Sequence, residues 1–159
     1  RTKLLSVSRN LSIDPNYIMA CIALETGKTF RTDIKNPGSS ATGLIQFMKS
    51  TADELGTTTA KLRKMDHVEQ MDYVEKYFKM QANNVGVSTD KWTLEDVYYS
   101  IFSPKTIKLG PNDIVYQESN GDLYSKNLYH DRNNDGKITK NEIAENIRVN
   151  YKQGIPEAG

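Results

Sequence analysis

The chain has 159 residues, of which 37% are hydrophobic and 26% charged, and this length and composition are typical of one globular domain with its own core. A net charge of +1 argues against a dominant role in binding nucleic acid or an anionic membrane, and no apolar run approaches the length of a membrane span. No signal-peptide pattern is present, and because the chain begins with Arg1 rather than Met we expect a processed product or a piece of a larger protein.

Two helices are predicted at the start of the chain. The first covers residues 2–10. The second begins after Asp14, a good N-cap residue, with Pro15 at the first helical position. Gly27 can end it in a left-handed cap.

Glu25 lies on the apolar face of this second helix. At helical spacing it shares that face with Ile18, Cys21 and Ile22, at the end where the helix dipole is negative. Burial and the dipole should both raise the pKa of Glu25, as a general acid requires. The alternative is a solvated surface glutamate in the last turn. We interpret Cys21 as a core residue rather than a nucleophile.

The middle of the chain is predicted to be helical after one long loop. Residues 28–43 are rich in Gly, Ser, Thr, Asn and Pro and are predicted to form an ordered, functional loop. Helices are predicted at 44–55, from 66 to about 82, and from 93 to 104. Capping patterns mark the start of the last two.

The C-terminal third is predicted to be less regular. Residues 105–130 carry turn signals and allow a short hairpin at 120–121, and a last helix is expected at 140–150. The fold class is therefore mainly α. The two histidines, His67 and His130, are interpreted as surface residues.

Residues 131–142 match the calcium-binding loop of an EF-hand, with Gly136 at its sharp turn. The predicted ligands are Asp131, Asn133 and Asp135 by their side chains, Lys137 by its backbone carbonyl, Thr139 directly or through water, and Glu142 as the bidentate ligand. The alternative is a polar turn that binds nothing. Because only one loop is present, a structural Ca²⁺ is favoured over a calcium switch.

Three segments around Glu25 resemble a known family. Glu-Thr-Gly at 25–27, Ala-Thr-Gly-Leu-Ile-Gln-Phe at 41–47 and Thr-Ala at 51–52 are similar to motifs of the soluble lytic transglycosylases, whose core fold is shared with goose-type lysozymes. Phage-borne members of that family often carry an EF-hand-type loop downstream, as this chain does. The resemblance covers roughly residues 4–104, plus the calcium loop.

The resemblance implies a lysozyme-like helical core at residues 1–104, with 105–159 packed as an extension of the same domain. It also implies cleavage of the β-1,4 bond between N-acetylmuramic acid and N-acetylglucosamine in peptidoglycan. Glu25 would protonate the glycosidic oxygen and then accept the proton of the muramic acid C6 hydroxyl, which gives a 1,6-anhydro product.

The same resemblance implies residues that bind the substrate. They are Thr26, Ser40, Gly43, Gln46 and Tyr99. Thr26 replaces the usual serine, and its hydroxyl would hydrogen-bond the glutamate. Gly43 would let the glycan approach the backbone closely. The family's tyrosine motif is blurred at Tyr98-Tyr99, so Tyr98 is the alternative to Tyr99.

Three other functions stay open at this point. A hydrolase would need a second carboxylate, for which Asp33 is the best candidate. The chain could instead be a non-catalytic peptidoglycan-binding module of a larger phage or secretion assembly, or a calcium-responsive interaction domain. With glycan strands as the partner, the site of action would be the cell wall, reached from the periplasm, from outside the cell or from a virion.

Overall fold

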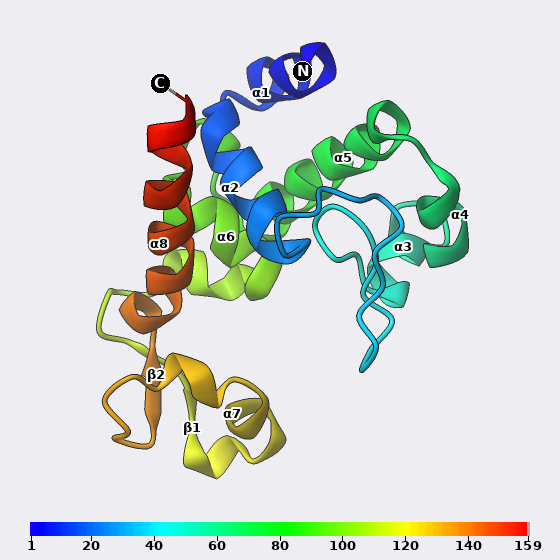
Figure 1. Ribbon diagram of the computed structural model, residues 1–159. Coiled ribbons are helices and arrows are strands. Elements are labelled where there is room, and N and C mark those ends of the chain that lie inside the picture. The colour runs from blue at the N-terminus through cyan, green and yellow to red at the C-terminus, as the bar shows by residue number, and fades with distance from the viewer. Residues whose placement is uncertain (159) are drawn as a thin grey trace.

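The computed structural model describes the backbone of residues 1–158 and the side chains of residues 1–154, so residue 159, the end of the expected extension, lies outside the described residues. The fold is mainly α, as predicted (Figure 1). Its helices are α1 (Thr2–Leu11), α2 (Pro15–Glu25), α3 (Lys49–Glu54), α4 (Thr59–Lys64), α5 (His67–Val85), α6 (Leu94–Phe102), α7 (Asp122–Lys126) and α8 (Lys140–Ala158), with strands β1 (Ile114–Gln117) and β2 (Lys137–Thr139).

Local capping signals explain where the long helices begin. The side chain of Asp14 accepts a hydrogen bond from the backbone N–H of Asn16, ahead of Pro15 at the start of α2. Reciprocal capping boxes start α5 at Asp66 and α6 at Thr93. These boundaries follow from hydrogen bonds between residues three or fewer apart, so the sequence predicted them correctly.

The helix predicted at 44–55 is wrong in its first half, because α3 begins only at Lys49. Thr42 and Phe47 instead exchange two backbone hydrogen bonds of 3.0 and 2.8 Å, which close a tight turn. Gln46 adopts a left-handed φ of 56° within this turn. Tertiary contacts thus override the helical pattern, and the short helix α4 was not predicted.

The hairpin predicted at 120–121 is also wrong. Strand β1 pairs antiparallel with β2, which lies inside the predicted calcium loop, and Tyr116 stands opposite Ile138. Ile138 is fully buried. Because Ile138 must be buried, pairing between the distant strands β1 and β2 is favoured, and a local hairpin at 120–121 is not formed.

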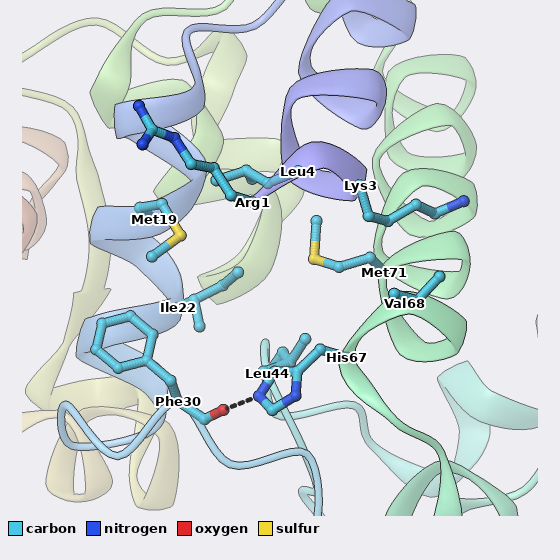
Figure 2. Close-up of a pocket in the computed structure, with 10 residues that line it drawn as sticks. All are labelled: Arg1, Lys3, Leu4, Met19, Ile22, Phe30, Leu44, His67, Val68 and Met71. Atoms are coloured by element: carbon cyan, nitrogen blue, oxygen red, sulfur yellow. Dashed lines mark hydrogen bonds between the residues drawn. The ribbon is translucent and has the colours of Figure 1, made fainter.

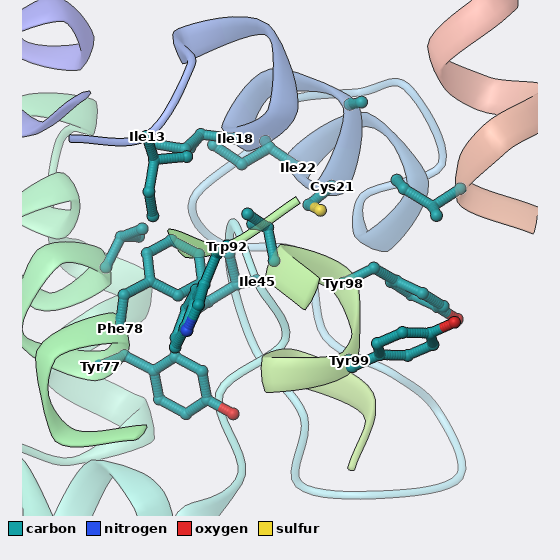
Figure 3. Packing of buried hydrophobic residues seen from close by; sticks show 14 of the residues in the cluster. Ile13, Ile18, Cys21, Ile22, Ile45, Tyr77, Phe78, Trp92, Tyr98 and Tyr99 are labelled. Carbon is teal, nitrogen blue, oxygen red and sulfur yellow. The ribbon is translucent and has the colours of Figure 1, made fainter. Parts of the chain in front are cut away.

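Helix α8 packs against α2 and α6, and α1 packs against α5. Between them lies an aromatic core in which the rings of Phe78 and Trp92 meet edge to face at 6.0 Å (Figure 3). In Figure 1 the C-terminal end of α2 lies between the loop at 28–47 and the irregular segment at 105–139. No helix in the described part of the chain is long and apolar enough to cross a lipid bilayer.

Candidate active site

Glu25 is the last residue of α2, and its neighbours on the helix face, Ile18, Cys21 and Ile22, are buried in the core. The carboxyl group itself is only partly exposed. Burial raises the pKa of Glu25 from 4.5 to about 7. Among the side chains that the structure describes, none forms a hydrogen bond or ion pair with this carboxyl. Glu25 is therefore partly protonated near neutral pH. Its carboxyl can donate a hydrogen bond or a proton to a bound ligand.

The negative charge of Glu25 acts on two buried tyrosines. Burial is the main reason that the pKa values of Tyr77 and Tyr98 are raised, and the charge of Glu25 adds to the rise in each. The hydroxyl of Tyr77 donates a 2.6 Å hydrogen bond to the backbone carbonyl of Ser100. The charged form of Glu25 is disfavoured by the burial of its own carboxyl.

Tyr98, rather than Tyr99, is the tyrosine of α6 that lies near Glu25. The hydroxyl of Tyr99 donates to the carbonyl of Lys140 at 2.9 Å, which ties α6 to α8. The charges that act on the pKa of Tyr99 are those of Arg148, Glu95 and Asp96. Figure 3 shows the two tyrosines side by side below Cys21. The geometry therefore favours Tyr98, the alternative reading of the motif, and assigns Tyr99 to core packing.

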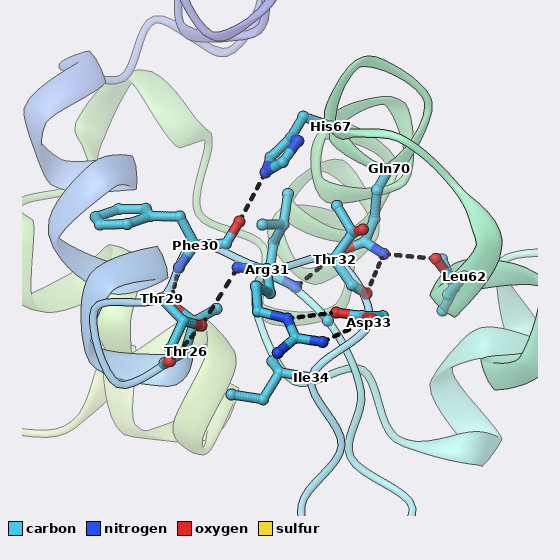
Figure 4. A network of polar contacts seen from close by, with 12 residues as sticks. Thr26, Thr29, Phe30, Arg31, Thr32, Asp33, Ile34, Leu62, His67 and Gln70 are labelled. Carbon is cyan, nitrogen blue, oxygen red and sulfur yellow. Dashed lines mark hydrogen bonds and ion pairs between the residues drawn. The ribbon is translucent and has the colours of Figure 1, made fainter.

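Thr26 does not bind the glutamate or the substrate, contrary to the prediction. It is fully buried. Its hydroxyl donates to the carbonyl of Ile22 at 2.7 Å and accepts from the backbone N–H of Phe30 at 3.0 Å (Figure 4). Thr26 therefore ends α2 and sets the direction of the following loop, and so positions Glu25 indirectly.

The space beside the Cα atom of Gly43 is filled by the side chain of Gln70. It is buried with a φ of 79°, and a Cβ atom at this position would lie 2.5 Å from Oε1 of Gln70. The prediction of a close glycan contact at Gly43 is therefore wrong. Glycine is required here because the turn is left-handed and Gln70 fills the adjacent space.

Gln70 of α5 organises the loop, and the sequence analysis missed it. Its Oε1 accepts from the N–H of Leu44 at 2.7 Å, and its Nε2 donates to the carbonyls of Thr32 and Leu62 at 2.9 and 2.8 Å (Figure 4). The side chain is fully buried. Its position four residues before Val74, on the apolar stripe of α5, was the available signal.

Gln46 lines a small cavity of about 60 Å³ together with Tyr77 and Ile101. Its Nε2 donates to the carbonyl of Gly43 at 2.9 Å, so the amide orientation is fixed by the loop. Ser40, on the far part of the loop, accepts a hydrogen bond from the N–H of Lys49 and so caps the start of α3.

Asp33 is already paired. It is exposed and receives two 2.9 Å hydrogen bonds from the guanidinium of Arg31, which lowers its pKa (Figure 4). A carboxylate held in this way is a weaker base and is less free to activate water. A second carboxylate, Glu54 of α3, contributes with Glu25 to the raised pKa of Tyr77.

The segment at 131–142, predicted to be an EF-hand loop, is closed by hydrogen bonds between its own residues. Both carboxylate oxygens of Asp131 accept backbone N–H groups, from Asp135 at 3.1 Å and Gly136 at 2.9 Å. Gly136 has a φ of 80°, and Glu142 closes the loop by accepting from the N–H of Arg132 at 3.0 Å. Thr139 and Glu142 form a capping box at the start of α8.

The oxygen atoms that this loop offers are of the types that bind calcium. Carboxylate, amide and carbonyl oxygens are the ligands that Ca²⁺ prefers, and Asp131, Asn133 and Asp135 are joined by hydrogen bonds of 3.3 and 3.1 Å. Among the described residues, however, no three acidic, histidine or cysteine side chains converge as a metal site does. Calcium binding therefore stays a prediction. It is supported by the oxygen atoms of the loop and by the hydrogen bonds that close it.

His130 is fully buried, so its interpretation as a surface residue is wrong. Its ring meets that of Phe102 edge to face at 5.3 Å, and neither of its ring nitrogens has a hydrogen-bond partner among the described residues. Burial lowers its pKa to about 4. His130 is therefore neutral at pH 7 and anchors the residues that precede the loop. His67 is exposed, as expected, and its Nε2 bonds to the carbonyl of Phe30 at 2.7 Å.

An apolar cavity lies between α1, α2, the loop and α5. It measures about 390 Å³ and is lined mainly by apolar side chains from α1, α2, the loop and α5, including Met19, Phe30 and Met71 (Figure 2). Glu25 is not among its lining residues, and the cavity offers no acid to a bound sugar.

Comparison of the chain with models of known protein families and with curated proteins finds no match.

Proposed function

We propose that the chain is a lytic transglycosylase that cleaves the glycan strands of peptidoglycan. The observation that carries the proposal is the carboxyl of Glu25, which is partly buried, has no hydrogen-bond or ion-pair partner among the described side chains and has a pKa of about 7. The motif resemblance at 25–27, 41–47 and 51–52 supports the choice of substrate. The chain would act on the cell wall, from the periplasm, from outside the cell or from a virion.

In this mechanism Glu25 serves first as an acid and then as a base. The protonated carboxyl gives its proton to the glycosidic oxygen while the bond from that oxygen to C1 of muramic acid breaks. The C6 hydroxyl of the same sugar then attacks C1 and returns its proton to Glu25. The product is a 1,6-anhydro sugar, no water is consumed, and one carboxyl suffices.

The products of digestion test this reaction against hydrolysis. Purified peptidoglycan is digested with the protein, and the soluble muropeptides are analysed by mass spectrometry. We expect fragments one water lighter than hydrolysis products, ending in 1,6-anhydro-muramic acid. Reducing ends would establish hydrolysis, and Asp33 would be the next residue to replace. Binding to peptidoglycan without any soluble product would establish a binding module.

The pH dependence of the rate follows from the raised pKa of Glu25. Because the acid must be protonated in free enzyme, kcat/KM should fall with rising pH above about 7, by about tenfold for each pH unit. Release of soluble fragments between pH 5 and 9 would be measured. A rate that rises through pH 7 would mean that Glu25 does not act as the acid.

We further propose that the loop at 131–142 binds one structural Ca²⁺, held by the side chains of Asp131, Asn133, Asp135 and Glu142, by the carbonyl of Lys137, and by Thr139 directly or through water. The ion would supply the positive charge that lets these oxygens lie close together. Because Ile138 is buried and β1 pairs with β2 inside this loop, the ion would stabilise the C-terminal third of the chain.

Calcium removal should therefore lower the melting temperature. A ligand present at about 100 times its dissociation constant stabilises the folded state by about 2.7 kcal/mol. The Glu142→Ala variant should lose this calcium-dependent increment and, by losing the capping box, about 1 kcal/mol more. Glu145→Ala, on the same helix but outside the loop, is the matched control. An unchanged melting temperature of the wild type in chelator would contradict the proposal.

A further inference from the structure

Asp131, the first residue of the proposed calcium loop, is held by a side chain from outside that loop. The hydroxyl of Tyr124 donates a 2.6 Å hydrogen bond to Oδ2 of Asp131, and both side chains are buried. Oδ2 also accepts from the N–H of Gly136 at 2.9 Å, and Oδ1 accepts from the N–H of Asp135 at 3.1 Å. Among the described residues, Tyr124 is the only one outside 131–142 that hydrogen-bonds a side chain predicted to bind the ion.

Tyr124 is itself fixed by the fold. It lies in the middle of α7, which packs against β1 beside the loop (Figure 1). Its ring belongs to the hydrophobic core, and its backbone carbonyl accepts from the N–H of Asn127 at 3.0 Å, where the short helix ends. A close-packed ring on a fixed backbone leaves the hydroxyl little freedom to turn away from Asp131.

The chemistry of this contact suits a carboxylate that binds a cation. An ionised carboxylate can accept about four hydrogen bonds. Asp131 accepts three, and because Oδ2 takes two of them, Oδ1 is the oxygen that keeps a lone pair free. A phenol hydroxyl carries no charge, so it orients the carboxylate without the repulsion that an ammonium or guanidinium group would exert on Ca²⁺.

We propose that Tyr124 is a positioning residue of the calcium site, whose hydroxyl holds the carboxylate of Asp131 in the orientation that binds the ion. The proposal rests on the calcium binding proposed for residues 131–142. Hydrogen bonds from neighbouring groups orient the ligands of metal sites and raise their affinity. A carboxylate that is held in place beforehand also loses less conformational freedom when the ion binds. Tyr124 would therefore raise the calcium affinity of the loop without touching the ion.

Calcium titration of three proteins tests this role. The wild type, Tyr124→Phe and Tyr116→Phe are stripped of metal and titrated with Ca²⁺ in a calorimeter, which gives the dissociation constant of each. Tyr124→Phe keeps the buried ring and removes only the hydroxyl, so the dissociation constant should rise by about tenfold or more. Tyr116→Phe is the matched control, because Tyr116 lies in β1 beside the loop and its hydroxyl forms no hydrogen bond among the described residues. Its dissociation constant should stay within about twofold of the wild type.

Thermal unfolding separates positioning from a purely structural role. At a calcium concentration near the wild-type dissociation constant, Tyr124→Phe should lose most of the calcium-dependent rise in melting temperature. A structural hydrogen bond would instead lower the melting temperature equally in chelator and in calcium and leave the dissociation constant unchanged, and that result would overturn the proposal.

Two further outcomes would count against the role of Tyr124. An equal loss of affinity in Tyr116→Phe would overturn it, since the effect would then come from packing near the loop and not from the bond to Asp131. A wild type that binds no calcium would contradict the calcium site itself, and the role of Tyr124 with it. Unchanged affinity in Tyr124→Phe, beside a wild type that binds calcium, would contradict the role of Tyr124 alone.

Discussion

Replacement of Glu25 by Gln should abolish turnover and stabilise the protein at the same time. The amide keeps the size of the side chain but can neither give nor accept the proton, so the rate should fall by about a thousandfold or more. The measurements are release of soluble peptidoglycan fragments and thermal unfolding of the same variant. Asp33→Asn, at an exposed acid paired with Arg31, is the control and should keep its activity if one carboxyl suffices.

The gain in stability follows from the sign of the pKa change. The pKa of Glu25 is about 7 in the folded state against an ordinary value of 4.5, so between these values the folded state holds more protons than the unfolded state. Stability is therefore lost as pH rises from about 4.5 to about 7. At about 1.4 kcal/mol per pH unit, the loss is at most about 3 kcal/mol at pH 8.

Glu25→Gln removes this loss, so its advantage over the wild type should be present at pH 8 and should vanish near pH 4. An active site that destabilises the fold in this way is a common cost of catalysis. If the variant is equally stable or less stable than the wild type at pH 8, the carboxyl is not held in a desolvated environment. If it keeps full activity, Glu25 is not the catalytic acid.

Replacement of Gln70 by Met should give the largest loss of stability among single changes outside the hydrophobic core. Met has a similar volume and helix propensity but no amide, so the N–H of Leu44 and the carbonyl of Thr32 lose their partner. We expect the free energy of unfolding to fall by about 2–4 kcal/mol. Denaturant unfolding measures this, and the loop that carries Gln46 should become accessible to proteases.

Asn83→Met is the matched control, because Asn83 lies on the same helix and is exposed. It should change the free energy of unfolding by no more than about 0.5 kcal/mol. A loss in Gln70→Met that does not exceed that of the control would mean that the loop is held by its other contacts, such as the bond between His67 and the carbonyl of Phe30.

Much of the helical part of this fold could be predicted because its signals are local. Asp14, Asp66 and Thr93 each bond to backbone groups within three residues, so their sequence spacing is sufficient to place the helix starts. The same holds for Glu25, whose position on an apolar helix face follows from helical spacing alone. The loop at 131–142 was recognisable because its turn and its hydrogen bonds are made within the segment.

Contacts between residues that are far apart in the sequence were decided by the tertiary structure. Tyr98 and Tyr99 are adjacent in sequence, and only the packing of α6 against α2 and α8 assigns one to Glu25 and the other to Lys140. Gln70 reaches Leu44 across 26 positions, which no local pattern encodes.

The sequence by itself thus predicted the starts of the long helices and the position of Glu25 on an apolar helix face, since each depends on neighbours along the chain. The surroundings that raise the pKa of Glu25 depend on burial between separate elements, and only the folded chain produces that burial.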